Sequence, residues 1–126
     1  MFMYSDYSQH LLDHVKKIHF IGCGGRGMYP LIQILAAKGY ELSGSDMVVY
    51  SAAISKDNVE LNAAASYGIP TVERSVLLGY VSRLYKQSIC VSGTHGKTTT
   101  TSMITTALEL AGRDPSAVIG GKLPLI

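Results

Sequence analysis

The residues with the clearest chemical potential form a glycine-containing loop followed by a run of threonines, Gly93-Thr94-His95-Gly96-Lys97-Thr98-Thr99. Glycines allow successive backbone N–H groups to turn inward and surround an anion. A lysine at the end of such a loop is placed to bridge the β- and γ-phosphates of a nucleotide, and the next hydroxyl to ligate Mg²⁺. The spacing predicts that these seven residues bind ATP and Mg²⁺, with Lys97 and Thr98 as catalytic residues and Thr98 as the metal ligand.

This loop departs from the common GxxxxGK[ST] pattern, because Val91 stands where that pattern has a glycine. The chain therefore carries the shorter form GxxGKT, between an apolar segment and a segment with helical periodicity. Threonine is a mediocre helix former, but at a helix N-terminus its hydroxyl can serve exposed N–H groups and a ligand. His95 has no carboxylate close in sequence that would orient it as a base, so we assign it a positioning or adenine-side role.

A second glycine loop, GCGGRG, lies near the N-terminus and has the spacing GxGxxG at Gly22, Gly24 and Gly27. In a strand-turn-helix context this spacing lets a pyrophosphate approach the backbone at a helix N-terminus. Asp46 follows about twenty residues later, where an acid can accept a ribose hydroxyl. The pattern fits a nicotinamide dehydrogenase, a flavoprotein or a sugar-nucleotide binder. Arg26 is either a further charge for the diphosphate or a solvated side chain.

The elements that must position these loops follow an α/β pattern, because the apolar residues switch between short runs and helical spacing. We expect a Rossmann-like parallel sheet with flanking helices, followed by the first strand, loop and helix of a P-loop ATPase domain. The expected helices are 5–17, 28–38, 58–68, 74–87 and 97–111, and the expected extended segments are 17–22, 40–46, 47–54, 69–72, 88–92 and 117–119.

Two of these expected strands follow one another with nothing between them, at residues 46–47. Neighbouring parallel strands need a crossover connection of about a dozen residues or more. We infer that a helix and its loops are missing at this junction, either deleted from the chain or left out of the printed sequence.

Composition narrows the class of protein further. The chain has 126 residues, a net charge of +2 and 47% apolar residues, which suits one domain with a real core and shows no basic footprint for nucleic acid. It has no apolar run of about eighteen residues and no leader pattern, so a cytoplasmic protein with no membrane contact is expected. Cys23 and Cys90 are expected to be reduced thiols, with Cys90 in the core, and the pair His10 and His14 is expected to be a solvated helix face rather than a metal site.

The two loops together resemble the Mur ligase family, the ATP-dependent amino-acid ligases of peptidoglycan synthesis. The motifs that carry the resemblance are GCGGRGM, SGSD, YSAAI, DNVEL, IPTVERSVLL, GTHGKTTTT and AGRDPSAVIGG, over residues 17–121. Within the family, the histidine in GTHGKTTTT and the loop GCGGRGM resemble the branch that joins L-alanine to UDP-N-acetylmuramate.

The resemblance implies a division of labour between residues 1–87, a UDP-sugar-binding domain interrupted at 46–47, and residues 88–126, the start of the central ATP-binding domain. It implies an ATP-dependent reaction through an acyl phosphate, with UDP-N-acetylmuramate and L-alanine as substrates. The residues implied for the UDP-sugar are Gly22, Cys23, Gly24, Gly25, Arg26 and Gly27 on the diphosphate, Ser43 and Asp46 near the uridine, and Ser51, Asn58 and Glu60 toward the sugar. Ala52 and Val59 depart from the family pattern, in which a serine and a proline are usual.

Three other hypotheses stay open. The first is the recycling ligase of the same family, which attaches a preformed peptide, and the second is an NAD-dependent dehydrogenase domain. The third is a structural fragment that binds nothing. We expect the chain by itself to have no ligase activity, and its unpaired strand after Ser88 to favour self-association.

Overall fold

Three short parallel strands form the sheet at the centre of the computed structural model, which describes residues 10–22, 28–41 and 46–120. The strands are β1 (Ile18–Ile21), β2 (Met47–Tyr50) and β3 (Thr71–Glu73), in the order β1-β2-β3. Ile21 lies opposite Tyr50, and Tyr50 lies opposite Glu73, so the three carboxyl ends meet at one edge. The β-branched and apolar composition of β1 and β2 suits strands that are covered on both faces.

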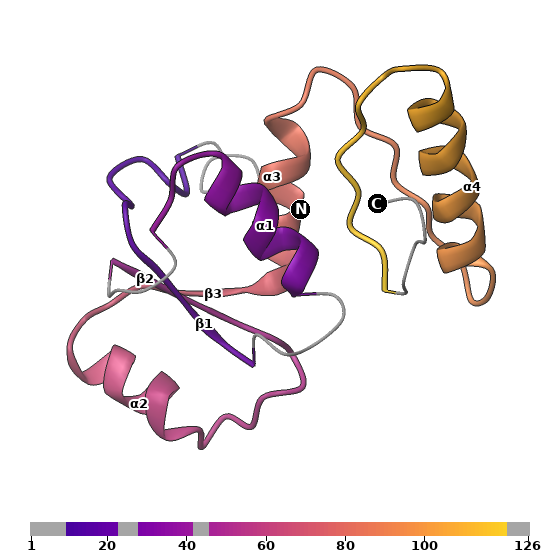
Figure 1. The fold of residues 1–126 in the computed structure, drawn as a ribbon. Coiled ribbons are helices and arrows are strands. Elements are labelled where there is room, and N and C mark those ends of the chain that lie inside the picture. Colours follow the sequence, from indigo (N-terminus) through magenta and orange to yellow (C-terminus); the bar gives the residue numbers. More distant parts are fainter. Residues whose placement is uncertain (1–9, 23–27, 42–45, 121–126) are drawn as a thin grey trace, which may run out of the picture.

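Helices cover both faces of this sheet, as Figure 1 shows. Helices α1 (Tyr29–Ala37) and α3 (Arg74–Arg83) lie on one face, and α2 (Val59–Ser66) lies on the other. Helix α1 begins with Pro30 in its first turn, where a missing N–H costs no hydrogen bond. The result is the expected α/β architecture, a parallel sheet with flanking helices.

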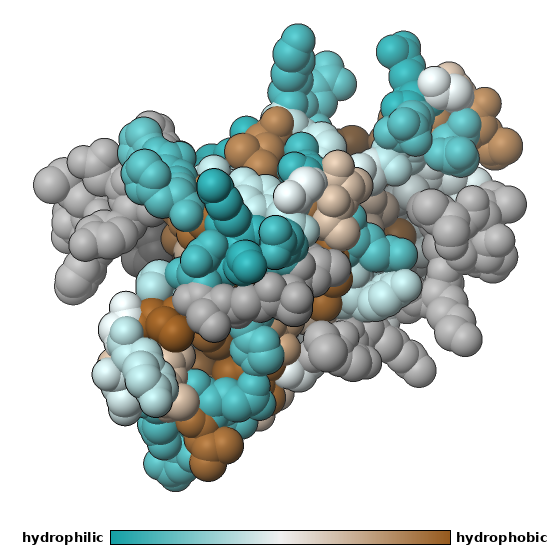
Figure 2. Space-filling model, turned by 60° about the vertical axis from the view of Figure 1, so that its left-hand side comes forward, coloured by the Kyte–Doolittle hydropathy of each residue, from teal (hydrophilic) through white to brown (hydrophobic). Residues whose placement is uncertain are grey.

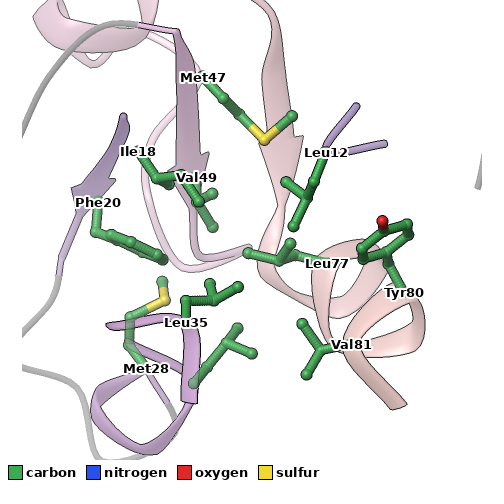
Figure 3. Packing of buried hydrophobic residues seen from close by; sticks show 11 residues of the cluster. Leu12, Ile18, Phe20, Met28, Leu35, Met47, Val49, Leu77, Tyr80 and Val81 are labelled. Atoms are coloured by element: carbon green, nitrogen blue, oxygen red, sulfur yellow. The ribbon is translucent and has the colours of Figure 1, made fainter. Parts of the chain in front are cut away.

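The main core fills the space between the sheet and the pair α1 and α3 (Figure 3). Leu31 and Leu35 of α1, Leu77 of α3, and Ile18 and Val49 of the sheet have no exposed surface. A smaller cluster under α2 contains Ile21, Val48 and Ala64. Alternate residues of a strand point to opposite faces, so both faces of β1 and β2 contribute to a core.

The chain forms hydrogen bonds with one edge of β1 before the junction at 46–47 and with the other edge at and after it. Glu41 pairs with the outer edge of β1, where it accepts a hydrogen bond from Ile18 N at 2.9 Å and donates one to Lys16 O at 2.9 Å. Lys17 O accepts from Asp46 N at 3.2 Å, and backbone groups of successive strand residues point to opposite edges. The chain therefore passes from one edge of β1 at Glu41 to the other edge at Met47, around the amino end of the strand.

The prediction of a strand at 40–46 was wrong for the described residues. Glu41 forms only an isolated bridge with Lys17, and Asp46 is not in a strand. Residues 42–45 lie outside the described part of the chain.

The predicted helix at 5–17 was also wrong where the structure describes it. Residues 11–14 form a turn, and His14 has a φ of +120°, which no right-handed helix contains. Leu12 is nevertheless buried in the main core, so the apolar side chain is placed by a turn instead of a helix. Residues 5–9 lie outside the described part of the chain.

The last helix, α4 (Lys97–Leu110), lies away from the sheet, beyond α3, together with the segments that precede and follow it (Figure 1). The helices predicted at 58–68, 74–87 and 97–111 are confirmed with shorter bounds. The strands predicted at 88–92 and 117–119 were wrong, because a strand exists only when it is paired and neither segment has a strand partner among the described residues. Cys90 is accordingly exposed, where a core position was expected.

The surface mixes apolar and polar side chains over the face shown in Figure 2. Within the described residues, no helix is long and apolar enough to cross a membrane.

Candidate nucleotide sites

The carboxyl edge of the sheet brings two of the predicted UDP-sugar residues together. Gly22 follows β1 and Ser51 follows β2, and the residues before them, Ile21 and Tyr50, are register partners. Gly22 has a φ of +78°, a left-handed conformation that glycine adopts without steric cost. Parallel α/β sheets bind ligands outside the carboxyl ends of their strands, so this edge is the candidate site for the sugar nucleotide.

Asn58 and Glu60 lie at the start of α2 and have partners within the fold. Asn58 caps the helix, because its Oδ1 accepts hydrogen bonds from Glu60 N at 2.9 Å and Leu61 N at 3.2 Å. Glu60 forms an ion pair with His19 of β1, with 2.7 Å between Glu60 Oε2 and His19 Nε2. Both side chains of this pair are about half exposed, so the contact links α2 to the sheet and adds little stability.

Asp46 lies at the opposite end of β1 from the glycine turn. Its Oδ2 accepts hydrogen bonds from Lys16 N at 3.0 Å and Lys17 N at 2.9 Å, and these bonds lower the pKa of the Asp46 carboxyl. From Lys17 to Gly22 the chain spans about 16 Å, at about 3.3 Å per residue. The structure therefore corrects the expectation that Asp46 meets a ribose hydroxyl near the glycine loop: its carboxylate caps the amino end of β1.

The remaining predicted residues of this site lie outside the described part of the chain. They are Cys23, Gly24, Gly25, Arg26, Gly27 and Ser43.

The second loop lies at the N-terminus of α4. Gly93 has a φ of +150°, and Gly96, the N-cap, has a φ of +80° in the left-handed region. The first helical hydrogen bond runs from Thr100 N to Gly96 O at 2.9 Å. Lys97 Nζ donates to Gly93 O at 2.5 Å and reaches Thr94 O at 3.4 Å, so the ammonium group lies against the inner carbonyls of its own loop.

These residues fit the group that the sequence predicts. Gly96 is open, since a Cβ there would meet no atom within 4 Å, and Thr94, His95, Thr98 and Thr99 are exposed. A helix N-terminus presents free N–H groups to a phosphate, and Lys97 supplies the adjacent positive charge. The donor set of glycine amides, an ammonium group and threonine hydroxyls is suited to a nucleotide triphosphate with Mg²⁺.

No cluster of three or more metal-ligating side chains occurs in the described ranges. His10 instead pairs with Asp13, with 2.5 Å between His10 Nδ1 and Asp13 Oδ2, while His14 adopts its left-handed turn.

Sequence reasoning missed two residues that lie next to predicted site residues: His19 beside Glu60, and Ile54 beside Gly22. His19 gave no signal as a partner of Glu60, since the pair is separated by forty-one positions. Ile54 looked like part of a continuous strand at 47–54, but the strand ends at Tyr50 and Ile54 belongs to the following turn. The apolar residues around Ile54 in the sequence gave no indication that the strand ends at Tyr50 and that Ile54 lies in a turn.

Comparisons with known proteins place these loops in a family. The family model described as "Mur ligase family, catalytic domain" matches residues 17–50. The UDP-N-acetylmuramate–L-alanine ligase of Caldanaerobacter subterraneus subsp. tengcongensis is 39% identical over 145 residues, covering 91% of this chain and 32% of the relative. The chain belongs to the Mur ligase family.

Other relatives agree with this assignment. The UDP-N-acetylmuramate–L-alanine ligase of Burkholderia ambifaria is 41% identical over 139 residues, with 86% of this chain and 30% of the relative covered. The crystal structure of the UDP-N-acetylmuramate–alanine ligase of Thermotoga maritima matches with a TM-score of 0.74 at 26% identity, over 87% of this chain and 33% of that chain. The chain thus spans about a third of the length of these Mur ligases.

The alignment lengths differ from the length of this chain. The Caldanaerobacter alignment extends over 145 residues, more than the 126 residues of this chain. The relative therefore carries residues that this chain lacks. In the structure, the parallel strands β1 and β2 are joined through α1, so the pairing of β1 with β2 does not itself require a further crossover.

Proposed function

We propose that this chain is the nucleotide-binding part of a ligase that joins L-alanine to UDP-N-acetylmuramate with the use of ATP. The observation that carries the proposal is the identity of about 40% with UDP-N-acetylmuramate–L-alanine ligases over about nine-tenths of the chain. The two glycine loops support it, because each is built for an anion at the end of a strand or at the start of a helix.

The first loop and the loop after β2 would hold the UDP-sugar at the carboxyl edge of the sheet. Gly22 provides the left-handed turn that lets the diphosphate approach the backbone, and Ser51 lies next to it at the end of β2. Asn58 and Glu60 face the sugar less directly in this proposal, since one caps α2 and the other pairs with His19.

The second loop would hold the ATP phosphates. Lys97, whose ammonium group lies at the carbonyls of Gly93 and Thr94, would meet the β- and γ-phosphates, where its charge would stabilise the transferring phosphoryl group. The backbone N–H groups of 94–98 would orient the phosphates, and the Thr98 hydroxyl would hold Mg²⁺. ATP supplies the phosphoryl group that activates the substrate carboxylate for attack by the alanine amine.

The position of Asp46 disfavours the alternative of an NAD-dependent dehydrogenase. In that class an acid after the second strand binds the ribose 2′-hydroxyl beside the glycine loop. Here the acid predicted for that task is bound to Lys16 N and Lys17 N at the other end of β1.

Calorimetric titration of the chain with UDP-N-acetylmuramate, and separately with NAD⁺, tests the proposal. We expect the sugar nucleotide to bind and NAD⁺ not to bind. Gly22→Ala should abolish the sugar-nucleotide binding, while Gly39→Ala should leave it intact although its φ of +91° imposes similar strain. Binding of NAD⁺ alone would contradict the proposal.

Catalysis is expected to need residues beyond this stretch of the chain, which is about a third as long as its relatives. Phosphate release that depends on both UDP-N-acetylmuramate and L-alanine, measured with this chain alone, would overturn that expectation.

A further inference from the structure

The turn after β2 brings the side chain of Ile54 next to Gly22, the residue that follows β1. A Cβ placed on Gly22 would lie 3.4 Å from Ile54 Cδ1 and 3.9 Å from Ile54 Cγ1. These are ordinary van der Waals distances, so the Ile54 side chain lies directly against the space beside the Gly22 backbone. Among the described glycines, Gly22 is the one whose Cβ would meet an apolar side chain of another loop.

The position of Ile54 is fixed from two sides. Its backbone N donates to Ser51 O at 2.9 Å, and the Ser51 hydroxyl accepts a hydrogen bond from Ala53 N at 3.3 Å. Its side chain packs against the small cluster under α2, which contains Ile21, Val48 and Ala64. Ile54 therefore joins the turn after β2 and the α2 layer to the end of β1.

We propose that Ile54 is a positioning residue that holds the glycine turn and the loop after β2 in one arrangement, so that together they form the binding edge for the sugar nucleotide. This inference rests on the proposed function for its ligand. Ile54 has no polar atom, so it contributes to binding only through the position of Gly22 and Ser51.

Truncation of Ile54 would leave space beside Gly22 and release the contact between the two loops. Gly22 has no side chain of its own to pack and hold its position. The backbone at Gly22 should then sample arrangements that do not suit the approach of the diphosphate. A pre-organised site loses affinity when it must be ordered on binding.

The experiment compares Ile54→Ala, Ile54→Val and Ile69→Ala. Ile69 packs against the same cluster and is also half-buried, but it precedes β3 at the amino end of the sheet. Ile69→Ala therefore removes the same atoms from the same cluster without touching Gly22. Ile54→Val removes the Cδ1 atom at 3.4 Å and keeps the branched side chain with the Cγ1 atom at 3.9 Å, so it serves as an intermediate variant.

Two quantities are measured for each variant: the affinity for UDP-N-acetylmuramate by calorimetry, and the hydrogen-exchange rate of the Gly22 amide by NMR. We expect Ile54→Ala to weaken binding by about tenfold or more and to speed exchange at Gly22. Ile54→Val should give intermediate values of both, and Ile69→Ala should change neither beyond what its global stability accounts for.

Equal losses of affinity and of protection in Ile54→Ala and Ile69→Ala would overturn the inference, because the effect would then be one of general stability. Unchanged exchange at Gly22 in Ile54→Ala would overturn it as well. Faster exchange at Gly22 in Ile54→Ala alone supports the coupling of the two turns, even in a chain that does not bind the sugar nucleotide. Faster exchange at Gly22 without binding of the sugar nucleotide would contradict the proposed function and leave the positioning role of Ile54 intact.

Discussion

The carboxylate of Asp46 accepts backbone hydrogen bonds at the amino end of β1. It accepts two backbone hydrogen bonds, from Lys16 N and Lys17 N, at the place where the chain passes from one edge of the strand to the other. A charged acceptor makes such bonds shorter and stronger than a neutral one.

This arrangement predicts a pH dependence of stability. The two hydrogen bonds lower the pKa of Asp46 below its ordinary value of 3.8, so the folded state favours the charged form. The stabilisation is then present above pH 4 or so, and it is lost as the pH falls through the lowered pKa of the folded state. In Asp46→Asn this contribution to the pH dependence should disappear, which urea denaturation between pH 2 and pH 6 can measure.

Asp57→Asn is the matched control for that experiment, because Asp57 is an exposed aspartate in the loop before α2. Asp57→Asn should leave unchanged the loss of stability that occurs as the pH falls from 6 to 2. If Asp46→Asn also leaves this loss of stability unchanged, the hydrogen bonds from Lys16 N and Lys17 N to Asp46 do not stabilise the fold.

Lys97 should be needed for nucleotide binding and dispensable for folding. Its ammonium group donates to the carbonyls of Gly93 and Thr94, and the side chain is exposed. Lys97→Met should therefore reduce ATP affinity by about tenfold or more while the melting temperature stays within about 2 °C. Calorimetry with MgATP and a thermal melt give the two values.

Lys86→Met removes the same charge from an exposed position before the loop and should leave ATP affinity unchanged. Equal weakening in both variants would mean that Lys97 acts through net charge, and the assignment of a phosphate contact would be wrong.

Among the helices, α3 is attached to the sheet by one fully buried face. Leu77 has no exposed surface and packs into the main core, next to Tyr80 and Val81 (Figure 3). Helix α4 differs, since Leu110 is 80% exposed near its end. A leucine-to-alanine substitution should therefore lower the free energy of unfolding more at Leu77 in α3 than at Leu110 in α4.

Leu77→Ala should lower the free energy of unfolding by about 2–5 kcal/mol, because it removes buried methyl groups and leaves a cavity. Leu110→Ala should change it by less than about 0.5 kcal/mol. Chemical denaturation of both variants measures the difference. Both variants are measured in dilute solution, below the concentration at which the chain self-associates, and similar losses there would show that Leu110 is buried in the monomer.

The molecule as a whole combines a sheet covered by helices on both faces with a segment, 84–120, that contains α4 and has no strand. Ile89, Met103 and Leu110 of this segment are 63%, 68% and 80% exposed. Apolar side chains and unpaired extended backbone in one segment favour association with another surface.

We therefore expect the chain to self-associate through this segment. Light scattering should give a mass above 13.5 kDa that rises with concentration. The double variant Met103→Lys, Leu110→Lys should lower that mass, whereas Val59→Lys on α2, also strongly exposed, should not. A monomer mass at the highest concentration would contradict the expectation.

The sequence by itself determined the features that depend on local chemistry. Helical periodicity and capping residues predicted α2, α3 and α4, and the apolar runs predicted β1 and β2. The glycines at 22, 93 and 96 marked backbone turns, and all three have positive φ. These signals are local because steric limits on φ and ψ and the spacing of apolar residues act within a few positions.

Only the tertiary structure decided the features that depend on distant partners. It showed that the segments 88–92 and 117–119 do not become strands, that Cys90 is exposed, and that Glu60 pairs with His19. It also placed Asp46 at the amino end of β1 and Ile54 against Gly22. Strand pairing, burial and contacts between loops are non-local, because each requires a neighbour that the fold brings from elsewhere in the chain.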